Sequence, residues 1–530
     1  MLIDAKLLKD QQLLQGAVTV VGAGPAGIVV ALELANAGHE VILVESGGRQ
    51  FSEQTQNLSA TPYFDPKVHA AMSQCTRRQI GGTSTIWGGR CVPYDPLDFD
   101  ERPYIADSSW PIGYQDIAGY FQRTCDWFLC GNAEFDINNI PEIKQKSIVP
   151  GLPEGEVLTS LLERWSLPTN FGREYIQALS ASKKIKVVHG LTCTEIECND
   201  TGKRITGISA RTLGGKQVRL KSYAYVLACG GLETTRLLMA SDRKHPGGIG
   251  NHSDLLGRFY MGHISGRIAK VHFETPPKRT IYGFDRDAQG TYLRRRFSFT
   301  RELHNEKRLP NIVAWLANPD IHDPSHRNGV LSFAYLMLTS PVFGKFLASE
   351  AIRKSAAGGH ARRCVRQHIM NITRDALATM IFIPSFGYRR FISRRRIPGF
   401  FVYSAANTYP LHYHGEQVPN KDSQVSLVQD RDELGMRKLK LDLQFASQDV
   451  DGVIRAHQYW DEYLRRHRCG YLEYLTTDLE SSVQEQASDG FHQIGTTRMA
   501  ESAQNGVVGK QCNIHGFDHW PVQPSHPALH

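Results

Sequence analysis

Apolar runs and a helical pattern alternate near the start of the chain in the order expected of a parallel βαβ unit. A β-rich run over residues 17–21 precedes Pro25–Asn36, whose apolar positions have helical spacing, and the apolar run Val41–Glu45 follows. Gly38 marks the end of the predicted helix, because glycine readily adopts the left-handed conformation that closes a helix. We therefore expect strand, tight turn, helix and strand in this part of the chain.

A second group of short alternating segments lies between residues 185 and 229. Turn signals at Asn199–Gly202 and Gly214–Gly215 separate the runs, and the strands that the pattern predicts cover residues 186–188, 192–196, 205–210 and 217–220. Residues 266–484 have mixed periodicity and no nucleotide-binding motif, but they contain one long predicted helix at Asp449–His467. We expect this middle part to form a second domain that covers a ligand bound by the first.

The turn between the first strand and the first helix carries the motif G-x-G-x-x-G over residues 22–27. Gly22 permits a tight turn, Gly24 lets the backbone approach a pyrophosphate, and Gly27 allows close packing of helix on strand. The start of the helix adds N–H groups that bind phosphate, and Glu45 at the end of the second strand can accept hydrogen bonds from ribose hydroxyls. This pattern suits FAD or NAD; the alternative is a βαβ turn without a ligand. The predicted contacts are Gly22, Gly24, Pro25, Ala26, Gly27 and Glu45.

Composition and charge narrow the class of protein. The chain has 530 residues, is 41% hydrophobic and carries a net charge of +8, so it can form a large core and more than one domain. It has no uncharged apolar stretch of about 18 residues and no recognisable nucleic-acid module, and its first residues lack the pattern of a secretory signal, so we expect none. Its 10 cysteines are scattered without a C-x-x-C pair, which favours reduced thiols over disulfides or a metal site. We expect a cytoplasmic protein with no metal and no nucleic-acid partner.

Two later glycine-bearing segments favour FAD over NAD. The loop over residues 79–90 contains Gly81–Ser84 and Trp87–Gly89, and glycine, which has no Cβ atom, lets backbone amides approach a flat ring system. Residues 225–231 have the pattern of a buried strand that ends at glycines, before the predicted helix Glu233–Ala240. Taken singly, the two segments could also be an ordinary surface loop and an ordinary core strand.

In their order along the chain, these motifs resemble those of the glucose-methanol-choline (GMC) oxidoreductases, nearest to bacterial sugar- and pyranose-oxidase-like members. That family has an opening G-x-G-x-x-G, a G-G-x-S loop beside the flavin, a strand followed by an E-T-x-R-L helix, and a late H-x-x-G-T-x-x-M segment. The chain has similar motifs at residues 22–27, 81–89, 228–237 and 492–499, and residues 256–263 resemble a further family segment. The resemblance implies FAD and adds cofactor contacts from Gly81, Gly82, Thr83, Ser84, Trp87, Gly88, Gly89, Cys193, Ala228 and Gly230.

The resemblance implies an α/β fold in which a Rossmann-like FAD-binding domain is joined to a discontinuous second α+β substrate domain. We assign residues 1–100, 180–265 and 485–530 to the FAD-binding domain, and residues 101–179 and 266–484 to the substrate or cap domain. Some relatives attach the flavin covalently to a histidine in the glycine-rich loop, but the matching position here is Ile86. Because isoleucine cannot form that bond, we expect non-covalent FAD.

The resemblance also implies oxidation of a hydroxyl group to a carbonyl, in a sugar or another alcohol. The hydroxyl proton must leave while hydride passes to the flavin N5, and neutral imidazole suits this proton transfer near neutral pH. His492 opens the H-x-x-G-T segment, and in the family the matching histidine lies over the flavin, so we predict that His492 is the base. The sequence does not indicate the electron acceptor.

The C-terminal end departs from the family pattern. Gly509 stands where the family usually has Asp, and only His519–His530 remain after the last matching motif, too few for the second catalytic group and final helix of the relatives. His526 resembles that second group only faintly. We therefore expect a shortened FAD-binding domain. The alternative to an active enzyme is a catalytically impaired or truncated homologue that keeps a binding or partner-subunit role.

Residues 353–396 combine 11 lysines and arginines with a single acid, Asp375, and contain the mostly apolar run Ala376–Phe386. Basic flanks around an apolar run suit a peripheral membrane contact, or attraction of an acidic or phosphorylated substrate. The alternative is a solvated basic face with one segment in the core.

Overall fold

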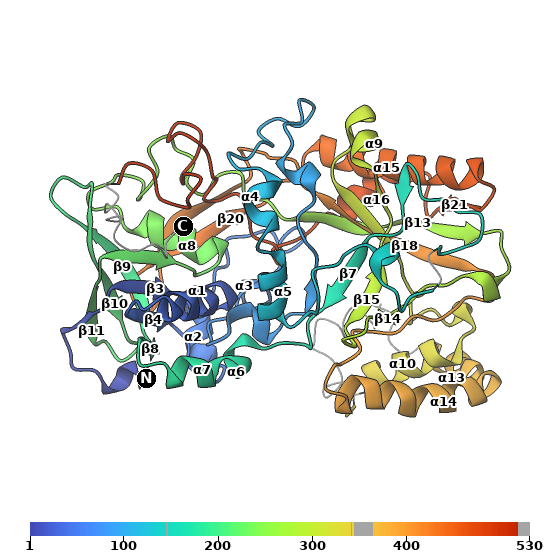
Figure 1. The fold of residues 1–530 in the computed structure, drawn as a ribbon, viewed down its shortest axis with the longest axis horizontal. Coiled ribbons are helices and arrows are strands. Elements are labelled where there is room, and N and C mark those ends of the chain that lie inside the picture. The colour runs from blue at the N-terminus through green and yellow to red at the C-terminus, as the bar shows by residue number, and fades with distance from the viewer. Residues whose placement is uncertain (145–146, 341, 344–363, 518–530) are drawn as a thin grey trace.

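The computed structural model describes residues 1–144, 147–340, 342–343 and 364–517. These residues form an elongated molecule with two lobes (Figure 1). The N-terminus and a parallel sheet lie in the first lobe, and an antiparallel sheet with several of the longer helices lies in the second lobe.

The first lobe is built on a five-stranded sheet in which all neighbouring strands run parallel. Its order is β1 (Leu2–Asp4), β8 (Ile185–His189), β4 (Val41–Glu45), β3 (Val18–Val21) and β12 (Ala224–Leu227). Every residue of β3 and β4 is buried, as expected for parallel strands that are covered on both faces. Helix α1 (Pro25–Asn36) packs on this sheet with one face, which buries Gly27, Ile28, Ala31 and Leu32.

A second sheet lies against the parallel sheet in the same lobe. Its order is β2 (Gln12–Gln15), β11 (Gln217–Lys221), β10 (Ile205–Arg211) and β9 (Thr192–Cys198). Val21 and Val44 of the parallel sheet share one apolar cluster with Ile208 and Leu220 of this sheet. Helix α8 (Gly231–Ala240) packs on β9 and follows directly after β12. Helix α8 therefore begins close to the end of β12.

The second lobe contains an antiparallel sheet in the order β17 (Ile312–Leu316), β18 (Thr408–Glu416), β13 (His263–Phe273) and β21 (Gly470–Tyr474). Helices α15 (Ser447–Arg466) and α16 (Leu479–Gln486) pack on this sheet. A smaller sheet has the order β14 (Asp285–Arg286), β15 (Tyr292–Arg295), β7 (Leu162–Trp165) and β5 (Arg90–Cys91). The outer edge of the lobe is a layer of helices, α10 (Gly329–Thr339), α13 (Val365–Arg374) and α14 (Ala376–Gly387) (Figure 1).

The predicted α/β class, with a Rossmann-like unit and a second domain, is confirmed. Helix α1 and strand β4 have the predicted ends, and α15 lies within two residues of its predicted bounds. The domain boundaries stay predictions. The other strands and α-helices of the described residues are β6 (Val157–Leu158), β16 (Ser298–Phe299), β19 (Gln424–Arg431), β20 (Arg437–Asp442), α2 (Glu53–Asn57), α3 (Met72–Cys75), α4 (Tyr114–Ala118), α5 (Phe121–Phe128), α6 (Phe171–Glu174), α7 (Ile176–Ala181) and α9 (Arg301–Glu306).

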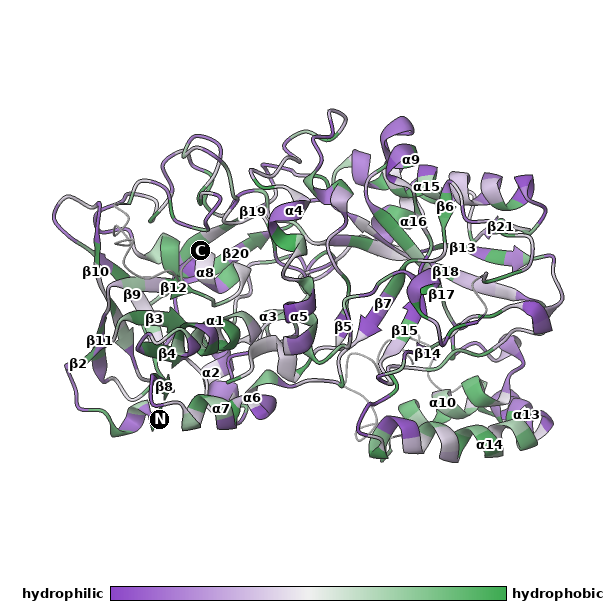
Figure 2. Cartoon of the chain, viewed as in Figure 1, coloured by the Kyte–Doolittle hydropathy of each residue, from purple (hydrophilic) through white to green (hydrophobic). Residues whose placement is uncertain are grey.

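Hydrophobic residues gather in two kinds of place (Figure 2). They fill the strands and α1 of the first lobe, and they also follow α14 at the outer edge of the second lobe. Across the described ranges, no helix is both long and apolar enough to cross a membrane. The 10 cysteines are free thiols. No group of His, Cys, Asp and Glu that could hold a metal occurs in the part of the chain that the structure describes.

Candidate active site

The turn after β3 holds its glycines where side chains would collide with backbone. Gly22 has a φ of +101°, and a Cβ atom on it would lie 2.5 Å from the carbonyl oxygen of Ala228. A Cβ atom on Gly27 would lie 1.9 Å from the carbonyl oxygen of Gly22, so only glycine allows α1 to meet the turn this closely. Helix α1 begins after Gly24, has Pro25 in its first turn and has no side-chain cap. Its start therefore offers N–H groups and partial positive charge to a phosphate.

Glu45 lies beside this turn at the end of β4. Its buried carboxylate accepts hydrogen bonds from the backbone N–H groups of Ala23 and Gly47, both at 2.8 Å. Burial raises the pKa of Glu45, while these hydrogen bonds and the charge of Arg78 oppose the rise. A carboxylate oxygen has more than one acceptor site, so Glu45 can still accept a ribose hydroxyl.

The second glycine-rich loop packs directly against the first. The N–H of Gly81 donates to the carbonyl of Ala23 at 2.7 Å. A Cβ atom on Gly82 would lie 2.9 Å from the Cα atom of Gly24, and both Gly81 and Gly82 have positive φ. The two loops therefore form one continuous surface of backbone atoms, which suits close approach of a flat or phosphorylated ligand.

The other predicted contacts in this loop have different surroundings. Ser84 is buried, and its hydroxyl oxygen accepts a hydrogen bond from the N–H of Phe171 in α6 at 3.1 Å. The indole Nε1 of Trp87 donates to the carbonyl of Thr169 at 2.8 Å, so this ring is fixed by the protein. Thr83 precedes Ser84 in the same 3₁₀ turn, and Gly88 and Gly89 follow Trp87.

Three predicted contacts lie around the end of β12. Ala228 follows the last residue of β12 and meets Gly22, as described above, and Gly230 caps the start of α8 with a φ of +82°. Cys193 in β9 is buried, and this burial, with the charges of neighbouring Cys229 and Glu45, raises the pKa of its thiol well above the ordinary value. The structure thus brings Cys193 close to Glu45.

The H-x-x-G-T segment reaches the same region from the far end of the chain. A Cβ atom on Gly231, at the start of α8, would lie 2.7 Å from the carbonyl oxygen of Gln493. Gly495 has a φ of +90°, and a Cβ atom there would lie 1.7 Å from the carbonyl oxygen of Phe259. These contacts fix the backbone that carries His492 next to the end of β12, the strand that pairs with β3.

His492 is paired with a carboxylate three residues before it. Its Nδ1 atom lies 3.2 Å from Oδ2 of Asp489, and the side chain of His492 is 51% exposed while that of Asp489 is 5% exposed. The N–H groups of His263 and Phe491 donate to the same carboxylate at 2.6 and 2.8 Å. Burial raises the pKa of Asp489, but the hydrogen bond and charge of His492 and these N–H groups outweigh it and hold the pKa below its ordinary value. An ionised carboxylate only accepts, so Nδ1 carries the hydrogen and the Nε2 lone pair is free to take a proton.

Further side chains surround His492. The ring centroid of His263, from β13, lies 4.3 Å from that of His492 and 5.4 Å from that of His414, from β18. Burial, together with the nearby charge of His492, lowers the pKa of His263 to about 4, so His263 is neutral at neutral pH. Arg90 is the last residue of the second glycine-rich loop, and its Nη2 donates to Nδ1 of His414 at 3.1 Å. Burial and the charge of Arg90 hold the pKa of His414 well below its ordinary value.

Three models of known protein families match segments that meet at this site. Two family models described as GMC oxidoreductase match residues 169–264 and 419–522, and a model described as FAD binding domain matches residues 15–56. The chain therefore contains two segments of the GMC oxidoreductase family, one on each side of the middle of the chain. The family and the FAD cofactor predicted from the sequence are thereby confirmed. The matched ranges include Glu45, Cys193, Ala228 and His492.

Curated relatives match the chain over part of their length. The 2-methyl-1,2-propanediol dehydrogenase of Mycolicibacterium austroafricanum is 22% identical over 325 residues, 48% of this chain and 56% of the relative. The paromamine 6'-oxidase of Streptomyces fradiae is 24% identical over 319 residues, 50% of this chain and 56% of the relative. The fructose dehydrogenase large subunit of Gluconobacter japonicus is 22% identical over 324 residues, 48% of this chain and 59% of the relative. The chain thus spans somewhat more than half the length of these relatives.

The residues at the two glycine loops fit an FAD molecule. The two glycine loops pack so closely that Cβ atoms on Gly22, Gly27 and Gly82 would collide with backbone. The start of α1 has no side-chain cap, and a buried carboxylate lies at the end of β4. Residues 22–27 would hold the pyrophosphate, and Glu45 would hold a ribose. The fit rests on the backbone of the two glycine loops, the free N–H groups at the start of α1 and the carboxylate of Glu45.

Several residues of the site were not predicted from the sequence. Asp489, His263, His414 and Arg90 come from four separate segments that converge on or near His492. The signals were present but weak: an acid three residues before the predicted base, an arginine at the end of the glycine loop, and histidines two apart on a strand. The predicted residue His526 lies outside the described residues.

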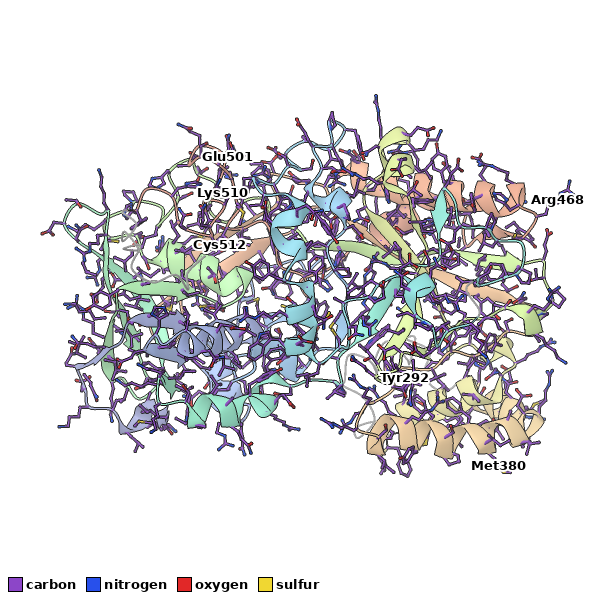
Figure 3. The ribbon with its side chains drawn as sticks, viewed as in Figure 1. Tyr292, Met380, Arg468, Glu501, Lys510 and Cys512 are labelled. Carbon is purple, nitrogen blue, oxygen red and sulfur yellow. The ribbon has the colours of Figure 1, made fainter. Side chains whose placement is uncertain are left out.

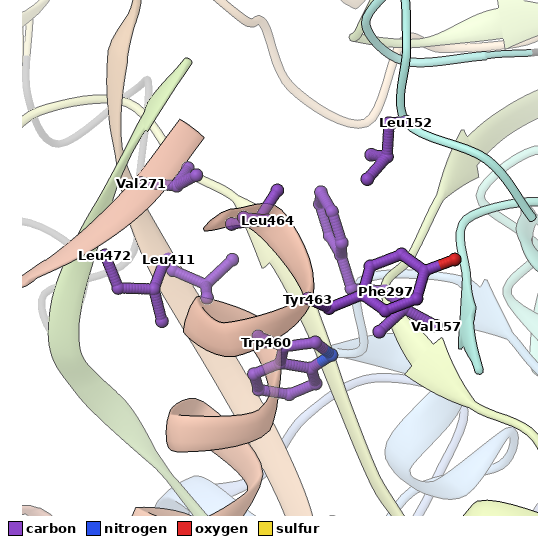
Figure 4. Close-up of a pocket in the computed structure, with 9 residues that line it drawn as sticks. All are labelled: Leu152, Val157, Val271, Phe297, Leu411, Trp460, Tyr463, Leu464 and Leu472. Carbon is purple, nitrogen blue, oxygen red and sulfur yellow. The ribbon is translucent and has the colours of Figure 1, made fainter. Parts of the chain in front are cut away.

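A cavity in the second lobe lies apart from this site. It has a volume of about 10 Å³ and lies between the sheet and α15 (Figure 4). A cavity of roughly this size holds at most one water molecule, so we do not assign the substrate to it. Its lining is apolar and aromatic: Leu152, Val157, Val271, Phe297, Leu411, Trp460, Tyr463, Leu464 and Leu472.

Proposed function

We propose that the chain oxidises a hydroxyl group of a sugar or another alcohol to a carbonyl, with FAD as the hydride acceptor and His492 as the base. The observation that carries this proposal is the His492–Asp489 pair, held in a segment that packs on the end of β12 beside the nucleotide turn. Bound FAD supplies a two-electron acceptor, so the chain has to orient the alcohol and take its proton.

The exposed imidazole of His492 suits that task. Its Nε2 lone pair would take the hydroxyl proton, and the ionised Asp489 would stabilise the imidazolium that forms. His263 stays neutral beside it, so it can hydrogen-bond a substrate oxygen without adding a competing charge. Asp489 is therefore a positioning residue, because it acts through His492.

We also propose how FAD is attached, which residues contact it and how the chain is divided into domains. We infer that FAD is held without a covalent bond, since Ile86 occupies the position of the covalent histidine. The division into a discontinuous FAD-binding domain and a cap domain is proposed with the boundaries given above. The proposed cofactor contacts are Gly22, Gly24, Pro25, Ala26, Gly27, Glu45, Gly81, Gly82, Thr83, Ser84, Trp87, Gly88, Gly89, Cys193, Ala228 and Gly230.

The names of the relatives support a small hydroxyl compound as the substrate class. They include a propanediol dehydrogenase, a paromamine oxidase and a fructose dehydrogenase subunit. Both dehydrogenases and an oxidase occur among them, so these names do not select oxygen or another electron acceptor. A substrate panel should therefore be read at the flavin itself.

The test is anaerobic mixing of the FAD-loaded chain with a panel of sugars and alcohols. The proposal predicts bleaching of the visible flavin band by at least one compound, with formation of the matching aldehyde or ketone. A chain that binds FAD but is bleached by none of the panel would contradict it. That result would favour the alternative of a homologue with a binding or partner-subunit role.

A further inference from the structure

The helices at the outer edge of the second lobe expose large apolar side chains. On α14, Leu377 is 70% exposed, and Met380 and Ile381 are each 64% exposed. Figure 3 shows Met380 pointing away from the lobe. The stripe continues at helical spacing through the π-helical turn Tyr388–Ile392, where Tyr388, Phe391 and Ile392 are also exposed. We call Leu377, Met380, Ile381, Tyr388, Phe391 and Ile392 the outer helical face.

Polar side chains occupy part of the inner side of the same helices, where a surface helix usually buries apolar residues. Nδ1 of His368 in α13 lies 3.0 Å from the hydroxyl of Ser332 in α10, and the amide of Asn371 donates to the same hydroxyl at 3.1 Å. Thr379 of α14 is buried against Gly329: a Cβ atom added to Gly329 would lie 2.5 Å from the threonine Oγ1. Phe382 and Phe386 of α14 pack against Phe400. The other large apolar side chains of α14 are exposed, as given above.

The segment that carries the outer helical face is rich in positive charge. Residues 364–396 contain seven arginines, and Arg366, Arg374, Arg394 and Arg396 are exposed. The single acid of this stretch, Asp375, accepts a hydrogen bond from the N–H of Gly329 at 2.9 Å, so it faces the protein. The neighbouring helix α10 contains no acidic residue. The predicted basic segment also included residues 353–363, which lie outside the described residues.

We propose that the outer helical face docks on an anionic membrane surface. A contiguous exposed apolar patch marks an interaction site, and apolar side chains bordered by arginines fit the boundary between acidic headgroups and acyl chains. A second copy of the chain would bring two positive rims together, which like charges oppose. The alternative of a solvated basic face with the apolar run in the core does not hold for α14, since its apolar stripe is exposed.

The test is sedimentation of the FAD-loaded full chain with vesicles of phosphatidylcholine alone or mixed with phosphatidylglycerol. We expect binding to the anionic vesicles at least about tenfold tighter than to the neutral ones, and weakening as salt is raised. The double variant M380S with I381S should lower the partition to anionic vesicles by about tenfold or more, because it removes inserted apolar area. R394Q with R396Q should lower the partition and flatten its salt dependence.

The matched control is L7S with L13S, which removes two exposed apolar side chains from the first lobe. This control should bind anionic vesicles as the unmodified chain does. FAD content should be unchanged in every variant, since all these side chains are exposed and none of them is a proposed FAD contact. The proposal is overturned if the unmodified chain does not sediment with anionic vesicles at low salt, or if M380S with I381S binds as tightly. Concentration-dependent self-association that M380S with I381S abolishes, without vesicle binding, would assign the face to a second copy instead.

Discussion

The nucleotide-binding unit and the outer helical face place apolar residues in opposite surroundings. In β4, Leu43 is 0% exposed, whereas Leu377 on α14 is 70% exposed. Both stretches are apolar in sequence, and the hydrophobic effect favours removal of both from water. The difference lies in what packs behind them: β4 has neighbours on both faces, while α14 turns Thr379 toward α10. An apolar sequence thus predicts that a segment is removed from water. Its tertiary neighbours decide whether other parts of the same chain bury it.

The same glycine-to-alanine change in the two regions should have opposite results, and this is the largest effect that we expect. In G27A, the added Cβ atom would lie 1.9 Å from the carbonyl oxygen of Gly22, so the turn must open and FAD binding should be lost. In G387A at the end of α14, φ is −56° and no atom lies within 4 Å of the added carbon. That variant should keep its FAD and gain up to about 1 kcal/mol of stability. The flavin-to-protein absorbance ratio after desalting measures both; full FAD content in G27A would contradict the prediction.

A leucine-to-alanine pair compares burial in the two regions directly. L43A should lower the free energy of unfolding by about 2–5 kcal/mol, because it leaves a cavity between covered strands. L377A should change the free energy of unfolding by no more than about 0.5 kcal/mol, because the side chain is exposed. Urea unfolding followed by circular dichroism measures the two variants side by side. A large loss in L377A would mean that the chain itself covers this face.

Two histidine–carboxylate pairs extend the comparison to polar residues. His492–Asp489 lies at the proposed active site, and His272–Glu473 lies on the sheet of the second lobe. H492A should slow anaerobic flavin reduction by about a hundredfold or more, with FAD content unchanged, because the base is removed. H272A should reduce flavin at the rate of the unmodified chain. Stopped-flow absorbance with a substrate from the panel gives both rates, and an unchanged rate in H492A would refute its role.

The smallest effect that we expect is that of the positioning carboxylate. D489N should slow flavin reduction by roughly tenfold, or about 1.4 kcal/mol, because the amide no longer stabilises a protonated His492. The acidic limb of the rate against pH should also move to lower pH, a change that a purely structural role would not produce. E473Q is the matched control and should leave rate and profile unchanged. A normal profile in D489N would assign Asp489 to the fold alone.

The first βαβ unit could be predicted almost residue by residue because its signals are local. The apolar spacing of Pro25–Asn36, the glycine turn before it and the run Val41–Glu45 follow from the preferences of neighbouring residues. The role of His492 stays a prediction, which rests on the resemblance of one compact motif to the family segment. Motifs of this kind predict local structure without information about the tertiary contacts of the chain.

The surroundings of His492 could not be predicted, because they depend on how distant strands pair. His414 joins the site since β13 and β18 pair with Ser265 opposite His414, a register that no local pattern specifies. Asp489 is fixed by the backbone of His263, more than 200 residues earlier. Likewise, the apolar run of α14 was compatible with a core segment until its contacts with α10 were known. In each case the missing information was tertiary.

The proposed catalysis depends on a single dissociable FAD molecule, which we propose to lie between the two glycine loops and the His492 segment. The direct measurement is the visible spectrum of the chain after loading with FAD and desalting, and of the filtrate after denaturation. We predict a yellow protein with one FAD per chain, all of which passes into the filtrate. A protein that stays colourless, or a flavin that stays on the denatured chain, would contradict this assignment.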